Sequence, residues 1–316
     1  MSTRCVLGLC CILFWSCSSD GDPAGPPGEP EVTSPKREYV VLTHLTEPRD
    51  IGIVPSEIYH YDAAFNLERV DVTVVGDDIF REASPIAFSR DENNLLAKVT
   101  TGYRTFNDMV EPTDFFFEWE RVFKYEDLLP IRLDTQTLSR RVVLGGETSS
   151  FQGHSHILLF WDKSQKLQSR QDYDGNGDLF TEWTYDFTDE KQVEIRSVTR
   201  TDDQVVVRTR LLALDDRDRV SKIEVLATND FGPISLVYDI EYLETGEGSI
   251  HVVATSTNVI GQEIKFERDM TFTYEMVEEP GIGAFVLDPE LGLRLLSPLY
   301  FPYGLGYGSI TMLQLL

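Results

Sequence analysis

Oxygen-bearing side chains recur at regular spacing in residues 172–178, which read Asp-Tyr-Asp-Gly-Asn-Gly-Asp. Asp172, Asp174, Asn176 and Asp178 occupy the first, third, fifth and seventh positions, and Gly177 occupies the sixth. Calcium is a hard cation that binds several oxygen ligands from a flexible loop, and a glycine at the sixth position permits a sharp turn. The spacing therefore predicts a calcium site formed by these four side chains.

Over its first eight positions this segment resembles the calcium loop of EF-hand proteins, with Leu179 at the eighth position. The twelfth position, which supplies a bidentate glutamate in that family, is Trp183 here, and Glu182 lies one residue early. No helical pattern flanks the segment. The alternative is a hairpin turn that uses Asp and Gly for backbone reasons and leads into a strand over 181–185. Both interpretations stay open, and Ca²⁺ is the one cofactor that the chain suggests.

His154 and His156 would point to one face of an extended segment, where both could bind a transition metal. Two ligands are too few for such a site, and no third ligand stands nearby in the sequence. The alternative is the polar start of a strand. The other histidines, His44, His60 and His251, stand singly, and we expect no catalytic base among them.

No catalytic motif is recognisable, so we expect a protein that is not an enzyme. The alternative is a surface glycoside hydrolase, because 53 acidic residues could place two carboxylates at catalytic separation. Aromatic side chains favour either a face that stacks on sugars or on a protein partner, or a packed core. They are Phe115, Phe116, Phe117, Trp119, Phe160, Trp161, Tyr300, Phe301 and Tyr303.

Beyond Lys36, apolar and polar residues alternate with a period of two, which is typical of half-buried strands. Four such runs cover residues 38–43, 69–75, 192–198 and 222–226. Turn-forming residues follow or separate the runs at 91–94, 174–177, 215–218 and 245–248. The pattern predicts an all-β fold, an antiparallel meander of successive hairpins forming one large curled sheet. A β-sandwich is the alternative.

A looser repeat runs through these hairpins, in which an aromatic or apolar residue precedes an aspartate, and a polar turn leads to an apolar residue. The copies begin at Tyr61-Asp62, Trp161-Asp162, Tyr173-Asp174 and Leu214-Asp215. The aspartate side chain can cap the backbone of such a turn. Across residues 56–245 the pattern resembles the YD repeats of Rhs-type proteins and is similar to secreted lipoproteins of unknown function. That resemblance implies a meandering sheet.

All four cysteines lie within the first 17 residues. The apolar run from Cys5 to Trp15 is shorter than the roughly 20 residues of a membrane-spanning helix. With Ser16-Cys17 after it, the segment resembles a bacterial lipoprotein signal peptide, which implies cleavage by signal peptidase II before Cys17 and lipidation of that cysteine. An ordinary secretory signal, or an uncleaved anchor with an inert thiol, is the alternative.

We therefore expect a signal peptide at 1–16, lipidated Cys17 with a disordered tether at 17–36, and a single all-β domain at 37–316. The tether is rich in Pro, Gly, Ser and acids and has almost nothing apolar to bury. Ser18 resembles the outer-membrane sorting pattern of Gram-negative lipoproteins, and Asp20 and Asp22 resemble signals for display outside the cell. The expected localisation is the cell envelope, at the outer membrane by a lipid anchor, with the domain facing the periplasm or the cell exterior.

The formal net charge of −25 disfavours nucleic acid as a partner, because phosphates repel an acidic chain. The expected partners are the membrane, through the N-terminal lipid, and a glycan or an envelope protein. We expect a membrane-anchored cell-envelope lipoprotein with a non-enzymatic binding or structural role. Besides the glycoside hydrolase, a periplasm-facing envelope assembly factor is the alternative.

Overall fold

The computed structural model divides into two units, Met1–Lys36 and Arg37–Leu316. The described residues all lie in the second unit and cover 38–46, 56–73, 80–107, 113–143, 148–189, 191–201, 204–229, 232–257 and 260–278. Cys17, the predicted tether and the aromatic residues Tyr300, Phe301 and Tyr303 lie outside these ranges. Within them, no helix has the length and hydropathy needed to cross a membrane.

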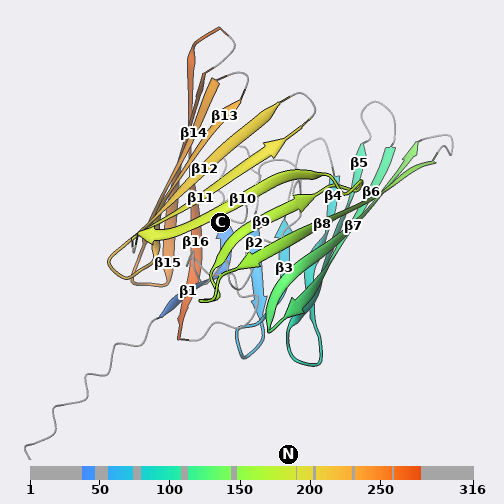
Figure 1. Ribbon diagram of the computed structural model, residues 1–316, viewed down its shortest axis with the longest axis horizontal. Helices are drawn as coiled ribbons and strands as arrows, with labels where there is room; N and C mark the ends of the chain where they lie inside the picture. Colours follow the sequence, from blue (N-terminus) through green and yellow to red (C-terminus); the bar gives the residue numbers. More distant parts are fainter. Residues whose placement is uncertain are drawn as a thin grey trace, which may run out of the picture. The chain divides into compact units, whose positions relative to one another are not determined.

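These ranges form sixteen β-strands, so the prediction of an all-β fold is confirmed (Figure 1). The first eight are β1 (Tyr39–Thr46), β2 (Ser56–Tyr61), β3 (Leu67–Thr73), β4 (Phe80–Arg90), β5 (Leu96–Asn107), β6 (Thr113–Glu126), β7 (Leu129–Val143) and β8 (Thr148–Trp161). The second eight are β9 (Leu167–Tyr173), β10 (Leu179–Asp189), β11 (Gln192–Arg200), β12 (Val205–Leu214), β13 (Val220–Asn229), β14 (Gly232–Tyr242), β15 (Glu247–Thr257) and β16 (Glu263–Val277).

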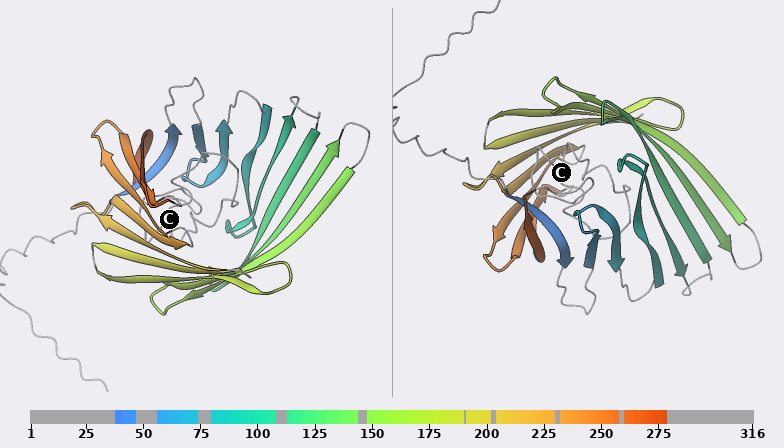
Figure 2. Two further views of the ribbon diagram at one scale, coloured as in Figure 1. Left: turned by 90° about the horizontal axis from the view of Figure 1, so that it is seen from above. Right: turned by 90° about the horizontal axis from the view of Figure 1, so that it is seen from below.

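The sheet closes on itself. Each strand pairs antiparallel with the next strand in sequence, and β16 pairs with β1, so the sixteen strands form a barrel around a common interior (Figure 2). At the closing seam Thr43 Oγ1 lies 2.8 Å from Thr273 Oγ1, although the two residues are 230 positions apart. The predicted curled open sheet and the alternative β-sandwich are therefore both wrong. Closure pairs both edges of the meander, which would otherwise be exposed to association with other chains.

Alternation along the strands separates an inner from an outer face. In β11, Val193 and Ile195 are buried, while Glu194 and Arg196 are exposed. Because successive side chains of a strand point to opposite faces, the buried set lines the interior. Side chains that are fully buried in this way come from strands all around the barrel, and they include Leu42, Leu67, Ile86, Leu96, Leu133, Leu167, Ile195, Leu212, Ile223 and Ile250. The core is therefore a layer inside the barrel.

The outer face carries charged side chains that pair across neighbouring strands. Lys98 on β5 lies 3.1 Å from Glu120 on β6, and His251 on β15 lies 2.8 Å from Asp269 on β16. These side chains are 40–74% exposed. Hydrogen bonding to Asp269, with the further acidic groups nearby, raises the pKa of His251. The outer face thus carries exposed ion pairs, together with exposed apolar side chains such as Ile58, Leu138 and Leu226.

Five hairpin turns share one arrangement, in which an aspartate Oδ1 accepts hydrogen bonds from the backbone N–H groups two and four residues later. The five aspartates are Asp62, Asp91, Asp162, Asp174 and Asp215. The predicted capping of the turns by aspartate is confirmed. In each turn the fourth residue has a positive φ, for example 62° at Asn94 and 88° at Gly177, a conformation that Asn and Gly adopt readily.

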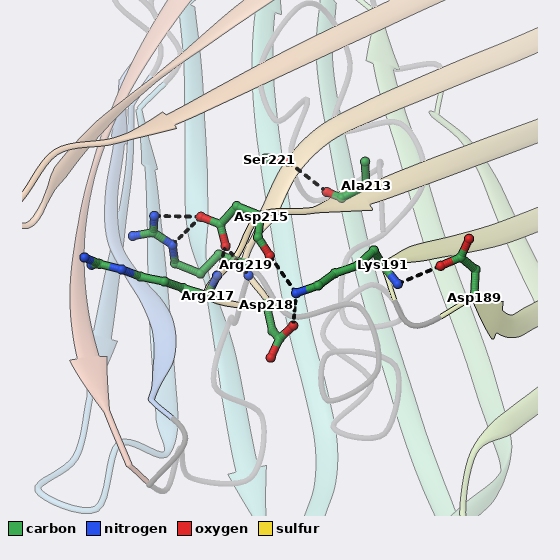
Figure 3. Close-up of polar contacts among 8 residues, drawn as sticks. All are labelled: Asp189, Lys191, Ala213, Asp215, Arg217, Asp218, Arg219 and Ser221. Carbon is green, nitrogen blue, oxygen red and sulfur yellow. Dashed lines mark hydrogen bonds and ion pairs between the residues drawn. The ribbon is translucent and has the colours of Figure 1, made fainter. Parts of the chain in front are cut away.

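The turn at 215–219 is hydrogen-bonded to the neighbouring connection between β10 and β11, as Figure 3 shows. Lys191, between β10 and β11, donates to the backbone carbonyl of Asp215 at 3.0 Å and to Asp218 Oδ1 at 2.7 Å. Asp215 also binds Arg219, whose Nη2 lies 2.7 Å from Oδ2. The end of the barrel that carries the turns at 62–66, 91–95, 162–166 and 215–219 is called the turn end below, and the opposite end is called the loop end.

Candidate functional site

The inner face changes from apolar to polar along strands β5 to β12, going from the turn end to the loop end. On β7 the inward residue Leu133 is followed by Thr135, and on β11 Ile195 is followed by Ser197. The buried polar residues of the described ranges are Glu57, Asn66, Thr101, Arg121, Thr135, Arg170, Asp172, Thr181, Ser197 and Arg210. An apolar floor at the turn end is therefore covered by a layer of hydroxyl and guanidinium groups.

Arg170 and Asp172 form a buried ion pair within this layer. Both alternate inward on β9, where they are 4% and 3% exposed. Arg170 Nε lies 2.5 Å from Asp172 Oδ1, and Nη2 lies 2.7 Å from Oδ2. Trp183 on β10 donates from its ring nitrogen to the same Oδ2 at 3.2 Å. Two-point pairing and the added indole bond offset part of the cost of burying the two charges.

Trp183 also lies beside two guanidinium groups. The guanidinium carbon of Arg170 is 5.1 Å from the Trp183 ring centre, and that of Arg210, on β12, is 4.8 Å away. Cations within about 6 Å of an aromatic ring centre are attracted by its negative face. On β14, burial raises the pKa of Tyr238, and the charges of Arg268 and Arg210 partly oppose that rise.

A second arginine and tryptophan pair lies on β6. The Arg121 guanidinium carbon is 4.8 Å from the Trp119 ring centre, and its Nε donates to Thr135 Oγ1 at 3.0 Å. Arg121 is 5% exposed. Together Arg121, Arg170, Arg210 and Arg268 form a layer of inward-facing cations with interleaved aromatic rings, which we call the arginine belt. Guanidinium groups held by neighbouring rings are suited to binding carboxylate or phosphate groups.

Besides Asp172 on β9, Glu57 on β2 is the other buried acid of the described ranges. It is 2% exposed, and Tyr59 donates to its Oε2 at 2.5 Å. Burial raises the pKa of Glu57 to about 8, against the smaller lowering effect of the Tyr59 hydroxyl. At neutral pH most of this carboxyl is therefore protonated. The two buried carboxyls of the described ranges stand on β2 and β9, which are not neighbours in the sheet.

The four residues of the predicted calcium site point in different directions. Asp172 faces the interior and binds Arg170, whereas Asp174 caps the turn between β9 and β10. Hydrogen bonds from the turn backbone, led by the N–H of Asp178, lower the pKa of Asp174. Asn176 and Asp178 lie exposed in the same turn. Across the described part of the chain, no three His, Cys, Asp or Glu side chains are placed to hold a metal. Calcium binding here stays a prediction.

His154 and His156 do share one face, which is the outer face of β8. Both line a shallow depression of about 470 Å³ together with Asp134 and the turn at Asp174. The His156 ring stacks on Tyr173, with ring centres 4.6 Å apart, and burial together with the charge of Arg132 lowers its pKa. This stacking and the strand position support the interpretation of the two histidines as strand residues.

The aromatic residues that the structure describes are split between the two faces. Trp119 is 5% exposed in the interior, and Trp161 donates to the Pro130 carbonyl at 2.7 Å. Phe160 alternates to the outer face and is 44% exposed. The side chain of Phe115 lies outside what the structure describes. No outward cluster of the aromatic residues that the sequence singled out is found among the described side chains.

The arginine belt was not predicted from the sequence, although a signal for it is present. Arg121 stands in phase with Trp119 and Phe123, and Arg210 stands in phase with Leu212. An arginine at the apolar phase of an alternating strand is a candidate inward cation. The signal is weak alone, because bulges such as the one between Ser169 and Leu167 shift the phase along a strand.

Comparisons with known proteins add a structural likeness. No family model matches the chain, and no curated protein matches it in sequence. Among solved structures, the chain is similar to a porin-like protein from Bacteroides uniformis, with 10% sequence identity and a TM-score of 0.36, over 74% of this chain and 96% of that chain. The assignment of this chain as a closed antiparallel barrel rests on its own strand pairing.

Proposed function

We propose that this chain is a lipid-anchored protein of the bacterial cell envelope whose barrel stands in water and works by binding rather than by catalysis. The acyl chains on Cys17 hold it at the outer membrane, and residues 18–36 act as the tether. The observation that supports a barrel standing in water is the set of charged residues on its outer face.

A barrel that spans a membrane has an apolar band on its outside and a polar interior. Here the interior floor at the turn end is apolar, and Glu118, Arg196 and Glu267 stand exposed on the outer face of β6, β11 and β16. A lysine or arginine on the lipid face at the bilayer midplane costs about 2–4 kcal/mol. An outer face of this kind suits water, and a lipid anchor then supplies the membrane attachment.

Single-cysteine labelling tests the position of the barrel. The chain has no cysteine after Cys17, so Glu267→Cys places one thiol on the outer face, and Ser164→Cys places one in an exposed turn as the matched control. In opened membranes, a membrane-impermeant maleimide should label both variants. Labelling of the turn variant with protection of the outer-face variant would overturn the proposal, because lipid would then cover the barrel wall.

Replacement of Cys17 tests the anchor. The Cys17→Ala chain should lose metabolic lipid labelling and leave membranes in an alkaline carbonate wash, while the unchanged chain stays with them. A Cys17→Ala chain that keeps its lipid label, or that stays in washed membranes, would contradict lipid anchoring through this cysteine.

A further inference from the structure

We infer that the inner face of β12 to β16 binds an anionic amphiphile, with its charged head at Arg208 and its apolar chain along the neighbouring strands. This inference rests on the proposed function and names the class of ligand. Its observations are a mostly apolar strip on the inward phase of β12 to β16, the exposure of most of that strip, and the arginines at its ends.

The strip consists of two rows of residues that pair in register across five strands. One row is Arg210, Val225, Leu236, Ala254 and Phe266, and the other is Arg208, Ala227, Ile234, Ser256 and Ile264. All ten share the inward phase of buried neighbours such as Leu212, Tyr238 and Met270. Four inter-strand spacings of about 4.8 Å give the strip a length of ~19 Å.

This strip is open from Leu236 to Phe266, whereas Arg210 and Val225 at its β12 end and the floor below it are buried. Phe266 is 58% exposed and Ile264 is 51% exposed, whereas Met270 and Phe272, further along the same face of β16, are each 2% exposed. Leu236, Ala254 and Ala227 are partly exposed. Large apolar side chains exposed on an inner face form a surface that an apolar chain can cover, with small alanines between them that leave room for it.

The charges that bound the strip are arginines. Arg208 is exposed, and Arg210 lies one inward position nearer the floor on the same strand. At the other end Arg268 precedes Met270 on the inward phase of β16. In a chain with a net charge of −25, a cationic inner edge favours an anionic head group, and guanidinium groups pair with either carboxylate or phosphate. Charge complementarity beside an apolar strip identifies the occupant as an amphiphile with one of these heads.

The binding experiment uses the Cys17→Ala full chain released from membranes, with dansyl-undecanoate as the fluorescent probe. Laurate and dodecyl phosphate should each displace the probe, and dodecanol, which has the same chain without the charge, should do so at least ten-fold less well. The two anionic competitors distinguish a fatty-acid-like ligand from a phosphate-bearing one. Equal competition by dodecanol would overturn the role of the arginines.

Two variants locate the site, and the charge change at Arg208 has a matched control. Arg208→Gln should weaken probe binding roughly ten-fold or more, since a charge-assisted hydrogen bond is lost. Arg196→Gln, on the outer face of the neighbouring strand β11, should leave binding unchanged. Phe266→Ser should weaken binding of the apolar chain of the probe. It should not lower the unfolding midpoint of the protein, because the Phe266 side chain is exposed.

The outcomes separate the two proposals. A released, folded chain that shows no saturable probe binding, or that binds equally well with Arg208→Gln, contradicts the ligand site and leaves the proposed position of the barrel standing. A Cys17→Ala chain that cannot be released from membranes contradicts the proposed function itself.

Discussion

Arg170 holds Asp172 inside the barrel through two hydrogen bonds, from Nε and Nη2 of its guanidinium group, at 2.5 and 2.7 Å, and the pair is almost fully buried. Trp183 binds the same carboxylate and lies beside the same guanidinium group. Asp172 was predicted as a calcium ligand, but its observed contacts make it the partner of a buried cation. Asp172 is thus the buried anionic partner of one arginine of the arginine belt.

Asp172→Asn should destabilise the protein by about 3–5 kcal/mol, because it removes the charge that balances a buried arginine. Urea unfolding measures the change. The control is Glu182→Gln on the outer face of β10, whose carboxylate lies 3.9 Å from Arg200, and which should cost less than about 1 kcal/mol. The double variant with Arg170→Gln should be less damaged than Asp172→Asn alone. Equal unfolding midpoints for Asp172→Asn and the control would contradict this account.

Glu57 should make stability fall with rising pH. Its pKa is about 8 in the folded protein against an ordinary 4.5, so the folded state holds the proton more tightly than the unfolded state. The resulting stability is complete below about pH 4.5 and is lost progressively up to about pH 8, by up to about 1.4 kcal/mol per pH unit.

Glu57→Gln tests this dependence, because glutamine cannot ionise. The variant should melt at a higher temperature than the unchanged protein at pH 8.5 and at a similar temperature at pH 4.5, whereas Glu68→Gln, at an exposed position on β3, should change neither. A pH profile of melting temperature that is the same with and without Glu57 would refute the prediction.

The capping aspartates should differ in importance according to their second contacts. Asp91→Ala removes two hydrogen bonds to the turn backbone and should cost about 1 kcal/mol. Asp215→Ala removes the same two bonds and also the partner of Arg219, which is 16% exposed in its side chain and stacks 4.2 Å from the Tyr242 ring centre. Urea unfolding should therefore rank Asp215→Ala as the more damaging change, and the reverse order would contradict it.

Gly248 should tolerate no side chain. The Phe272 ring lies over it, and an added Cβ would clash with that ring and lie 2.6 Å from the Glu241 carbonyl oxygen. Gly248→Ala should cost about 1–3 kcal/mol through overpacking and disturb the near-ultraviolet circular dichroism of Tyr242, Phe272 and Tyr274, whose rings are in mutual contact. Ser249→Ala, at the next position and on the other face, is the control. An unchanged spectrum for Gly248→Ala would argue against this packing.

Calcium binding at residues 172–178 is decided by thermal melting in millimolar Ca²⁺ and in chelator. Equal melting temperatures would favour the hairpin-turn interpretation, in which Asp172 is held by Arg170 and Asp174 Oδ1 binds the turn backbone. A higher melting temperature in calcium that disappears in Asp178→Asn would establish the site that the spacing predicts.

Local features of the fold followed from local sequence. The strands at 192–198 and 222–226 and the aspartate turns at 174 and 215 were predicted in place, because alternation and turn chemistry act over a few residues. The spacing of Asp172 and Asp174 suggested a shared ligand. Asp172 lies within β9 and points inward, whereas Asp174 lies one residue beyond the end of β9 and caps the turn.

The sequence by itself determined an all-β chain of hairpins with one polar face, and it indicated a lipoprotein-like N-terminus. Only the tertiary structure decided that β1 meets β16, which face became the interior, and that Arg121, Arg170, Arg210 and Arg268 share that interior. The physical reason is that alternation gives each strand two faces without saying which one the closed sheet encloses. The choice depends on pairing between residues as distant as Thr43 and Thr273, and no local pattern encodes that contact.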